Sequence, residues 1–114
     1  MKINFVLTLI AISISALFAY ALYSINNSEN KLLLCGGGFI FISVTLITTI
    51  AAQFKGERTT MNIKALSGIF FTIGLISHLV YAFISFSPAA YIIPAGLLVL
   101  IYISLVYSIG KNSE

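Results

Sequence analysis

Residues 63–109 read IKALSGIFFTIGLISHLVYAFISFSPAAYIIPAGLLVLIYISLVYSI and hold a single charged residue. A helix that ran through the whole stretch would far exceed the roughly 20 apolar residues that cross a bilayer. Ser87-Pro88 divides the stretch, because serine caps helix N-termini and proline suits the first helical position. The sequence therefore predicts two helices joined by a short turn, over residues 63–86 and 88–109.

The N-terminal half of the chain shows the same pattern. Apolar runs cover residues 3–25 and 32–54, and a short polar and charged segment follows each of them, at 26–31 and 55–60. Such long continuous runs predict helices, because a transmembrane barrel would show alternating segments of about ten residues. We expect one domain over residues 1–114, an all-α antiparallel bundle of four transmembrane helices.

The composition excludes a water-soluble domain. Hydrophobic residues make up 60% of the chain and charged residues 8%, whereas soluble domains average about 45–50% and about 25%. So few charges cannot cover the surface of a soluble globule, and the same composition excludes a disordered chain. We predict a multi-pass protein of the cell membrane, specifically a bacterial inner membrane, with the lipid bilayer as its main surroundings.

The first apolar run permits a second interpretation. Met1-Lys2, the apolar residues after it and the segment Ala19-Tyr20-Ala21 resemble a secretory signal with a small-x-small cleavage site. The run is longer than the apolar region of about 7–15 residues in such signals. No polar mature domain follows it. We therefore expect an uncleaved first helix.

The basic residues predict how the four spans are oriented. One side of the membrane would hold the N-terminus, the second connecting segment and the C-terminus, and with them Lys2, Lys55, Arg58, Lys64 and Lys111. The other side would hold only Lys31. Lys and Arg accumulate in short cytoplasmic segments, so both termini are predicted to be cytoplasmic. Tyr20, Tyr23 and Tyr91 would then lie at the outer boundary, where interfacial tyrosines are common.

Groups that could carry chemistry are scarce in the spans. No Asp, Glu, Lys or Arg lies deep within any of them, although ion-coupled transporters need such a group. The chain is similar in length and number of spans to the small multidrug resistance exporters, which depend on a glutamate in their first helix. Ser13 and Ser15 stand in that helix here, so no function is transferred. We expect no enzyme, no metal site, no cofactor and no nucleic-acid partner.

His78 is the one ionisable residue predicted to lie at depth, about 12 Å below the outer boundary at about 1.5 Å per residue. In the predicted hairpin it is level with Pro94, whose missing N–H frees the carbonyl of Ala90. We predict that His78 is neutral, bonds that carbonyl and has a structural role. The functional alternatives are a proton relay, or a metal or haem ligand that a symmetric dimer would complete.

Small and hydroxyl residues predict where the helices pack. Gly36, Gly37 and Gly38 each weaken a helix by roughly 1 kcal/mol relative to alanine, so close contact with a neighbour should offset them. We also expect Gly74 and Gly96 to pack. Stripes of such residues recur at helical spacing, including Ala11, Ser15 and Ala19, then Gly38, Thr45 and Thr49, then Ser67, Gly74, His78 and Ala82. They predict packing within the chain.

Two functions fit this pattern. The first is an accessory, regulatory or immunity-type protein that binds another membrane protein through its helix faces. The alternative is a small homo-oligomeric transporter or channel whose path is lined by hydroxyl residues and His78. The direction of the stripes discriminates between them, because stripes that converge inside one chain leave a path without walls.

Overall fold

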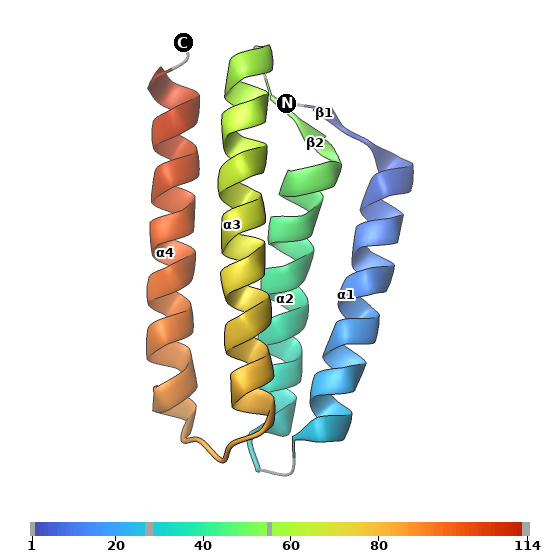
Figure 1. The fold of residues 1–114 in the computed structure, drawn as a ribbon, viewed down its shortest axis with the longest axis vertical. Coiled ribbons are helices and arrows are strands. Elements are labelled where there is room, and N and C mark those ends of the chain that lie inside the picture. Colours follow the sequence, from blue (N-terminus) through green and yellow to red (C-terminus); the bar gives the residue numbers. More distant parts are fainter. Residues whose placement is uncertain (1, 27–28, 55, 113–114) are drawn as a thin grey trace.

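The computed structural model describes residues 2–26, 29–54 and 56–112. Its four helices are α1 (Phe5–Ile25), α2 (Lys31–Ile50), α3 (Glu57–Ala82) and α4 (Pro88–Asn112). Successive helices run in opposite directions (Figure 1). All four are long and apolar enough to cross a membrane. The all-α fold with four candidate spans is the one that the apolar runs predict.

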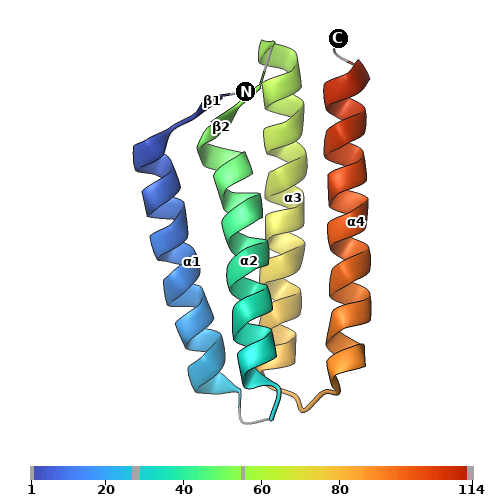
Figure 2. The same ribbon diagram turned by 180° about the vertical axis from the view of Figure 1, so that it is seen from behind.

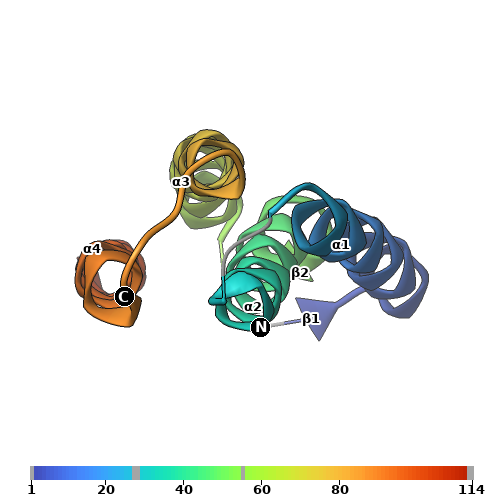
Figure 3. The ribbon, with the colours of Figure 1, turned by 90° about the horizontal axis from the view of Figure 1, so that it is seen from below.

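The helices pack in chain order and form a bent row. Helix α1 packs on α2, α2 on α3, and α3 on α4. The same order is seen from behind in Figure 2, and the view along the helices in Figure 3 shows α1 and α4 at the two ends of the row. The molecule measures 46 × 28 × 15 Å, so the bundle is flat. Helix α4 therefore has one main neighbour, which is α3.

Helix α3 lies nearer the N-terminus than the apolar run predicts. It begins at Glu57 instead of Ile63 and ends at Ala82 instead of Phe86. The polar residues at its start form helix as well. The carboxylate of Glu57, in the first turn, interacts favourably with the positive end of the helix dipole. At the other end, the Phe83 backbone N–H donates to the carbonyls of Val80 and Tyr81 instead of continuing the helical pattern, so α3 ends before Phe83. His78 is consequently only one turn from the end of α3.

A short two-stranded sheet closes one end of the bundle. Strand β1 (Lys2–Ile3) pairs antiparallel with β2 (Ala52–Gln53), and the Asn4 N–H donates to the Ala51 carbonyl at 2.9 Å. Of these residues, Ile3, Ala52 and Gln53 were predicted to be helical, because strands of two residues are too short to show an alternation of apolar and polar residues. The sheet ties the N-terminus to the connection between α2 and α3.

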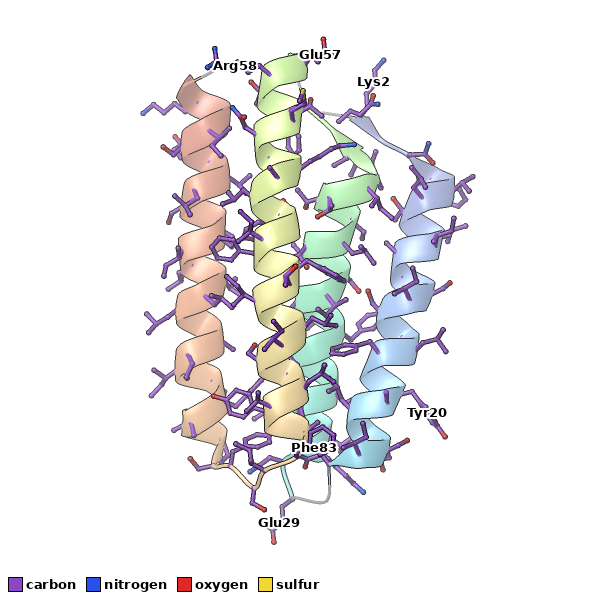
Figure 4. The ribbon with its side chains drawn as sticks, in the orientation of Figure 1. Lys2, Tyr20, Glu29, Glu57, Arg58 and Phe83 are labelled. Carbon is purple, nitrogen blue, oxygen red and sulfur yellow. The ribbon has the colours of Figure 1, made fainter. Side chains whose placement is uncertain are left out.

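Both chain ends lie at the same end of the bundle as this sheet (Figure 1). Lys2 and Arg58 are at that end in Figure 4, together with Glu57, whereas Glu29 is at the opposite end. Lys111, in the last turn of α4, is on the Lys2 side, and Lys31, which opens α2, is on the Glu29 side. Lys55 falls outside the described residues. The described basic residues are thus divided between the two ends as the orientation argument requires.

The stripes of small and hydroxyl residues converge inside the chain. Their buried members are Ala11, Ser15 and Ala19 on α1, Gly38 and Thr45 on α2, and Ser67, Gly74, His78 and Ala82 on α3. Several hydroxyls bond the carbonyl four residues earlier in their own helix, as Ser15 does to Ala11 and Thr45 to Phe41. The stripes serve packing within the chain, as predicted.

Helix α4 is attached to the bundle by two tyrosines. Tyr91 and Tyr102 are the only buried side chains among the residues of α4 whose burial the structure describes. They are 11 residues apart, which is about three turns, so both lie on the same face. The Tyr102 hydroxyl bonds the Ser67 hydroxyl of α3 at 2.6 Å, and its ring packs on Phe70. Most of the other described residues of α4 are exposed.

Candidate functional site

His78 is buried between α3 and α4, with 2% of its surface exposed. Its Nδ1 lies 2.7 Å from the Gly74 carbonyl oxygen, and its Nε2 lies 2.7 Å from the Tyr91 hydroxyl. A carbonyl oxygen can only accept, so Nδ1 carries the proton. In the neutral ring Nε2 is then an acceptor, and Tyr91 donates to it. The imidazole is thereby held in one tautomer and one orientation.

Tyr91 lies in the first turn of α4 and reaches across to α2. Its phenol lies directly over Gly37, where a Cβ would overlap the hydroxyl oxygen. Its ring meets those of His78 and Tyr81 edge-on, at centroid distances of 5.5 and 5.4 Å. Tyr91 lies near the end of the bundle, but its side chain is buried, because the acceptor on His78 and the missing side chain of Gly37 create a place for the phenol between the helices.

The carbonyl of Ala90, which Pro94 frees, has a partner from α3. That partner is Tyr81, whose hydroxyl donates to it at 2.6 Å. The predicted bond from His78 is not formed, since both ring nitrogens are engaged elsewhere. His78 and Pro94 border the same cavity, but the residue of α4 that His78 bonds is Tyr91, three residues before Pro94. Rotation about the helix axes decides which side chain reaches Ala90, and depth alone does not fix it.

Three of the five glycines predicted to pack lie in this region. Gly37 is covered by Tyr91, Gly38 faces Leu22 and His78, and the ring of Phe41 lies against Gly74. These contacts bring α2 close to α3 and α4. Gly36 and Gly96 differ from the prediction, because a Cβ at either would meet nothing within 4 Å. Both face away from neighbouring helices.

A cavity of about 130 Å³ lies beside the His78–Tyr91 pair. It is bordered by side chains of α2, α3 and α4, which are Phe41, Ser77, His78, Tyr81, Tyr91, Pro94, Ala95 and Leu98. Aromatic rings and aliphatic groups form most of this wall. We call this space the α3–α4 cavity.

Two asparagines join the connections at the end of the bundle nearest this cavity. The Asn26 side chain is buried and donates to the carbonyls of Tyr81, Ala82 and Ile84, at 2.8 to 3.3 Å. Asn30 donates to the Phe86 carbonyl at 2.6 Å. Sequence reasoning missed both residues. An asparagine in a polar connecting segment gives no signal that its amide is buried against another connection.

The site is a hydrogen-bonded aromatic cluster that fixes α3 to α4 and α2. Among the residues that the structure describes, no group of three His, Cys, Asp or Glu side chains could hold a metal ion. Every polar group of the cluster bonds another group of the same chain, which is the arrangement that buried polar groups need in an apolar environment. Comparison with models of known families, with curated protein sequences and with solved structures finds nothing that matches this chain.

Proposed function

We propose that the protein is an integral protein of a bacterial inner membrane, with four spans and both termini in the cytoplasm. Four helices of sufficient length and hydropathy support the spans. Their outward side chains are large and apolar, and Leu17, Leu32 and Leu100 are each at least 64% exposed. The position of the basic residues supports the orientation.

We further propose that it acts as an accessory, regulatory or immunity-type partner of another membrane protein. The observation that carries this proposal is Gly96 on the outward face of α4, the helix that has one main neighbour in this chain. A glycine weakens a helix, and a glycine in a membrane helix is useful where another backbone comes close. Among the described residues, none from another helix comes within 4 Å of a Cβ placed at Gly96. A helix of a second protein would supply the missing contact on the outward face of α4.

The inward direction of the stripes favours this role over the transporter alternative. Among the hydroxyl groups that were to line a path, those of Ser15, Thr45 and Ser67 are buried within the chain, and those of Ser15, Thr45 and Thr49 bond the backbone of their own helix. His78 is held by two hydrogen bonds within the chain. A transport path would have to break these contacts.

Site-directed photo-crosslinking in the native membrane tests the proposal. A photoreactive residue at Leu100, one turn from Gly96, should give one discrete protein adduct. The added mass should not be a multiple of this chain's 12.3 kDa. Adding Gly96→Leu should abolish the adduct. The matched control is Gly36→Leu, the same change at another open glycine, and it should leave the adduct in place. Lipid adducts alone would contradict the proposal.

A further inference from the structure

Each O–H or N–H group on the side chains that line the α3–α4 cavity already donates a hydrogen bond within the chain. Tyr81 donates to the Ala90 carbonyl, and Ser77 donates to the Gly74 carbonyl at 3.1 Å. His78 Nδ1 donates to that same carbonyl, and the Tyr91 hydroxyl donates to His78 Nε2. The polar side chains that line the cavity therefore have no hydrogen-bond donor left for a bound molecule.

Acceptor positions remain in the same wall. A hydroxyl oxygen that donates its one hydrogen keeps two lone pairs, and three hydroxyls border the cavity, those of Ser77, Tyr81 and Tyr91. The other walls are the Phe41 ring and the aliphatic side chains Pro94, Ala95 and Leu98. The cavity thus combines an apolar surface with oxygen atoms that can only accept.

We propose that the α3–α4 cavity binds a small neutral molecule with an apolar body and one hydrogen-bond donor, such as a phenol or a short alcohol. The space is partly open to the surface, and its volume of about 130 Å³ is similar to that of an engineered, enclosed apolar cavity of about 150 Å³ that binds benzene. A carboxylate or a phosphate needs hydrogen-bond donors, and in this cavity it would meet only acceptor oxygens. An ammonium ion would meet no carboxylate, since none of the eight lining residues is acidic, and burying an unpaired charge is costly.

This site is independent of the proposed partner role. The partner would bind the outward face of α4, whereas the cavity lies on its inward side, next to Tyr91. A bound molecule would touch α2, α3 and α4 at once and would stabilise their present arrangement. Failure of either proposal therefore leaves the other standing.

The test uses fluorine NMR on the full chain in lipid nanodiscs, with empty nanodiscs as the blank for partition into lipid. The probes are 4-fluorophenol, fluorobenzene and 4-fluorobenzoate. We expect saturable binding of one 4-fluorophenol per chain, about three- to tenfold tighter than fluorobenzene, which is the gain from one hydrogen bond. No saturable binding of 4-fluorobenzoate is expected. Equal binding of the phenol and fluorobenzene, preference for the benzoate, or partition into lipid alone would overturn the proposal.

A pair of alanine substitutions locates the bound probe. Ala95→Leu fills the cavity and should remove the saturable binding. Ala89→Leu adds the same atoms at an exposed position of the same helix and should leave it unchanged. If Ala95→Leu fails to fold, the wild-type chain with labelled alanine methyl groups still decides. Magnetisation transfer from the phenol to the Ala95 methyl group, and not to that of Ala89, is expected. Transfer to Ala89 alone would refute the location.

Discussion

The Tyr91 hydroxyl donates to Nε2 of His78 across the interface of α3 and α4, at 2.7 Å, while its phenol covers Gly37 of α2. One tyrosine thus joins three helices near one end of the bundle. At the other end, the bond between Tyr102 and Ser67 joins α3 and α4 again. Helix α4 is held at these two points, and most of its other described residues are exposed.

Replacing His78 tests whether this residue is structural. His78→Ala removes two hydrogen bonds, each worth on average about 0.6 kcal/mol in membrane proteins, so we expect the free energy of unfolding to fall by about 1–2 kcal/mol. Insertion and crosslinking to the partner should persist. Unfolding in mixed detergent, measured beside the crosslinking yield, checks both. Unchanged stability with complete loss of partner binding would show that His78 has a functional role.

Gly37→Ala should destabilise the protein, because the added methyl group overlaps the Tyr91 phenol, and overpacking costs about 1–3 kcal/mol. Gly36→Ala is the matched control at the preceding residue. It meets open space, so the better helix propensity of alanine should raise stability by up to about 1 kcal/mol. The same unfolding assay measures both variants. Equal effects at the two positions would mean that Tyr91 does not lie over Gly37.

Asn26→Ala should loosen the end of α3. The change leaves the carbonyls of Tyr81, Ala82 and Ile84 without the amide that bonds them, at an expected cost of about 1–3 kcal/mol. Hydrogen exchange should accelerate at the backbone amides around Phe83, whose turn is held in the same region. Ser24→Ala, at an exposed position nearby, provides the control. Protection that is equal in the two variants would refute the role of Asn26.

The proposed orientation predicts where reporters are active. A fluorescent protein fused after the C-terminus should fluoresce, because the proposed orientation places that end in the cytoplasm with Lys2, Arg58 and Lys111. Alkaline phosphatase, which needs the periplasm, should be inactive there and active when inserted beside Lys31. The reverse pattern of activities would invert the topology and remove the basis for placing the termini.

The number and order of the helices were predictable from the long apolar runs. A segment that crosses lipid must be apolar and must bond its own backbone N–H and C=O groups, as a helix does. The start of α3 was not predictable, since residues 57–62 are mostly polar and yet helical, and hydropathy cannot separate such a helical turn from a loop. Within the site, the hairpin places His78 and Pro94 at one cavity, and Tyr91 is the residue of α4 that His78 bonds. The partner of Ala90 depended on helix rotation, which is set by contacts such as Phe41 on Gly74 that involve a third helix.

The mass of the assembly in the native membrane tests the central claim most directly, namely that this chain is the partner of a different membrane protein. Extraction in lipid particles without detergent, followed by native mass spectrometry, should give a complex whose mass exceeds 12.3 kDa by that of one or more other proteins. The Gly96→Leu variant should release this chain as a monomer. A wild-type chain that is monomeric at 12.3 kDa, or present only as multiples of that mass, would contradict the account.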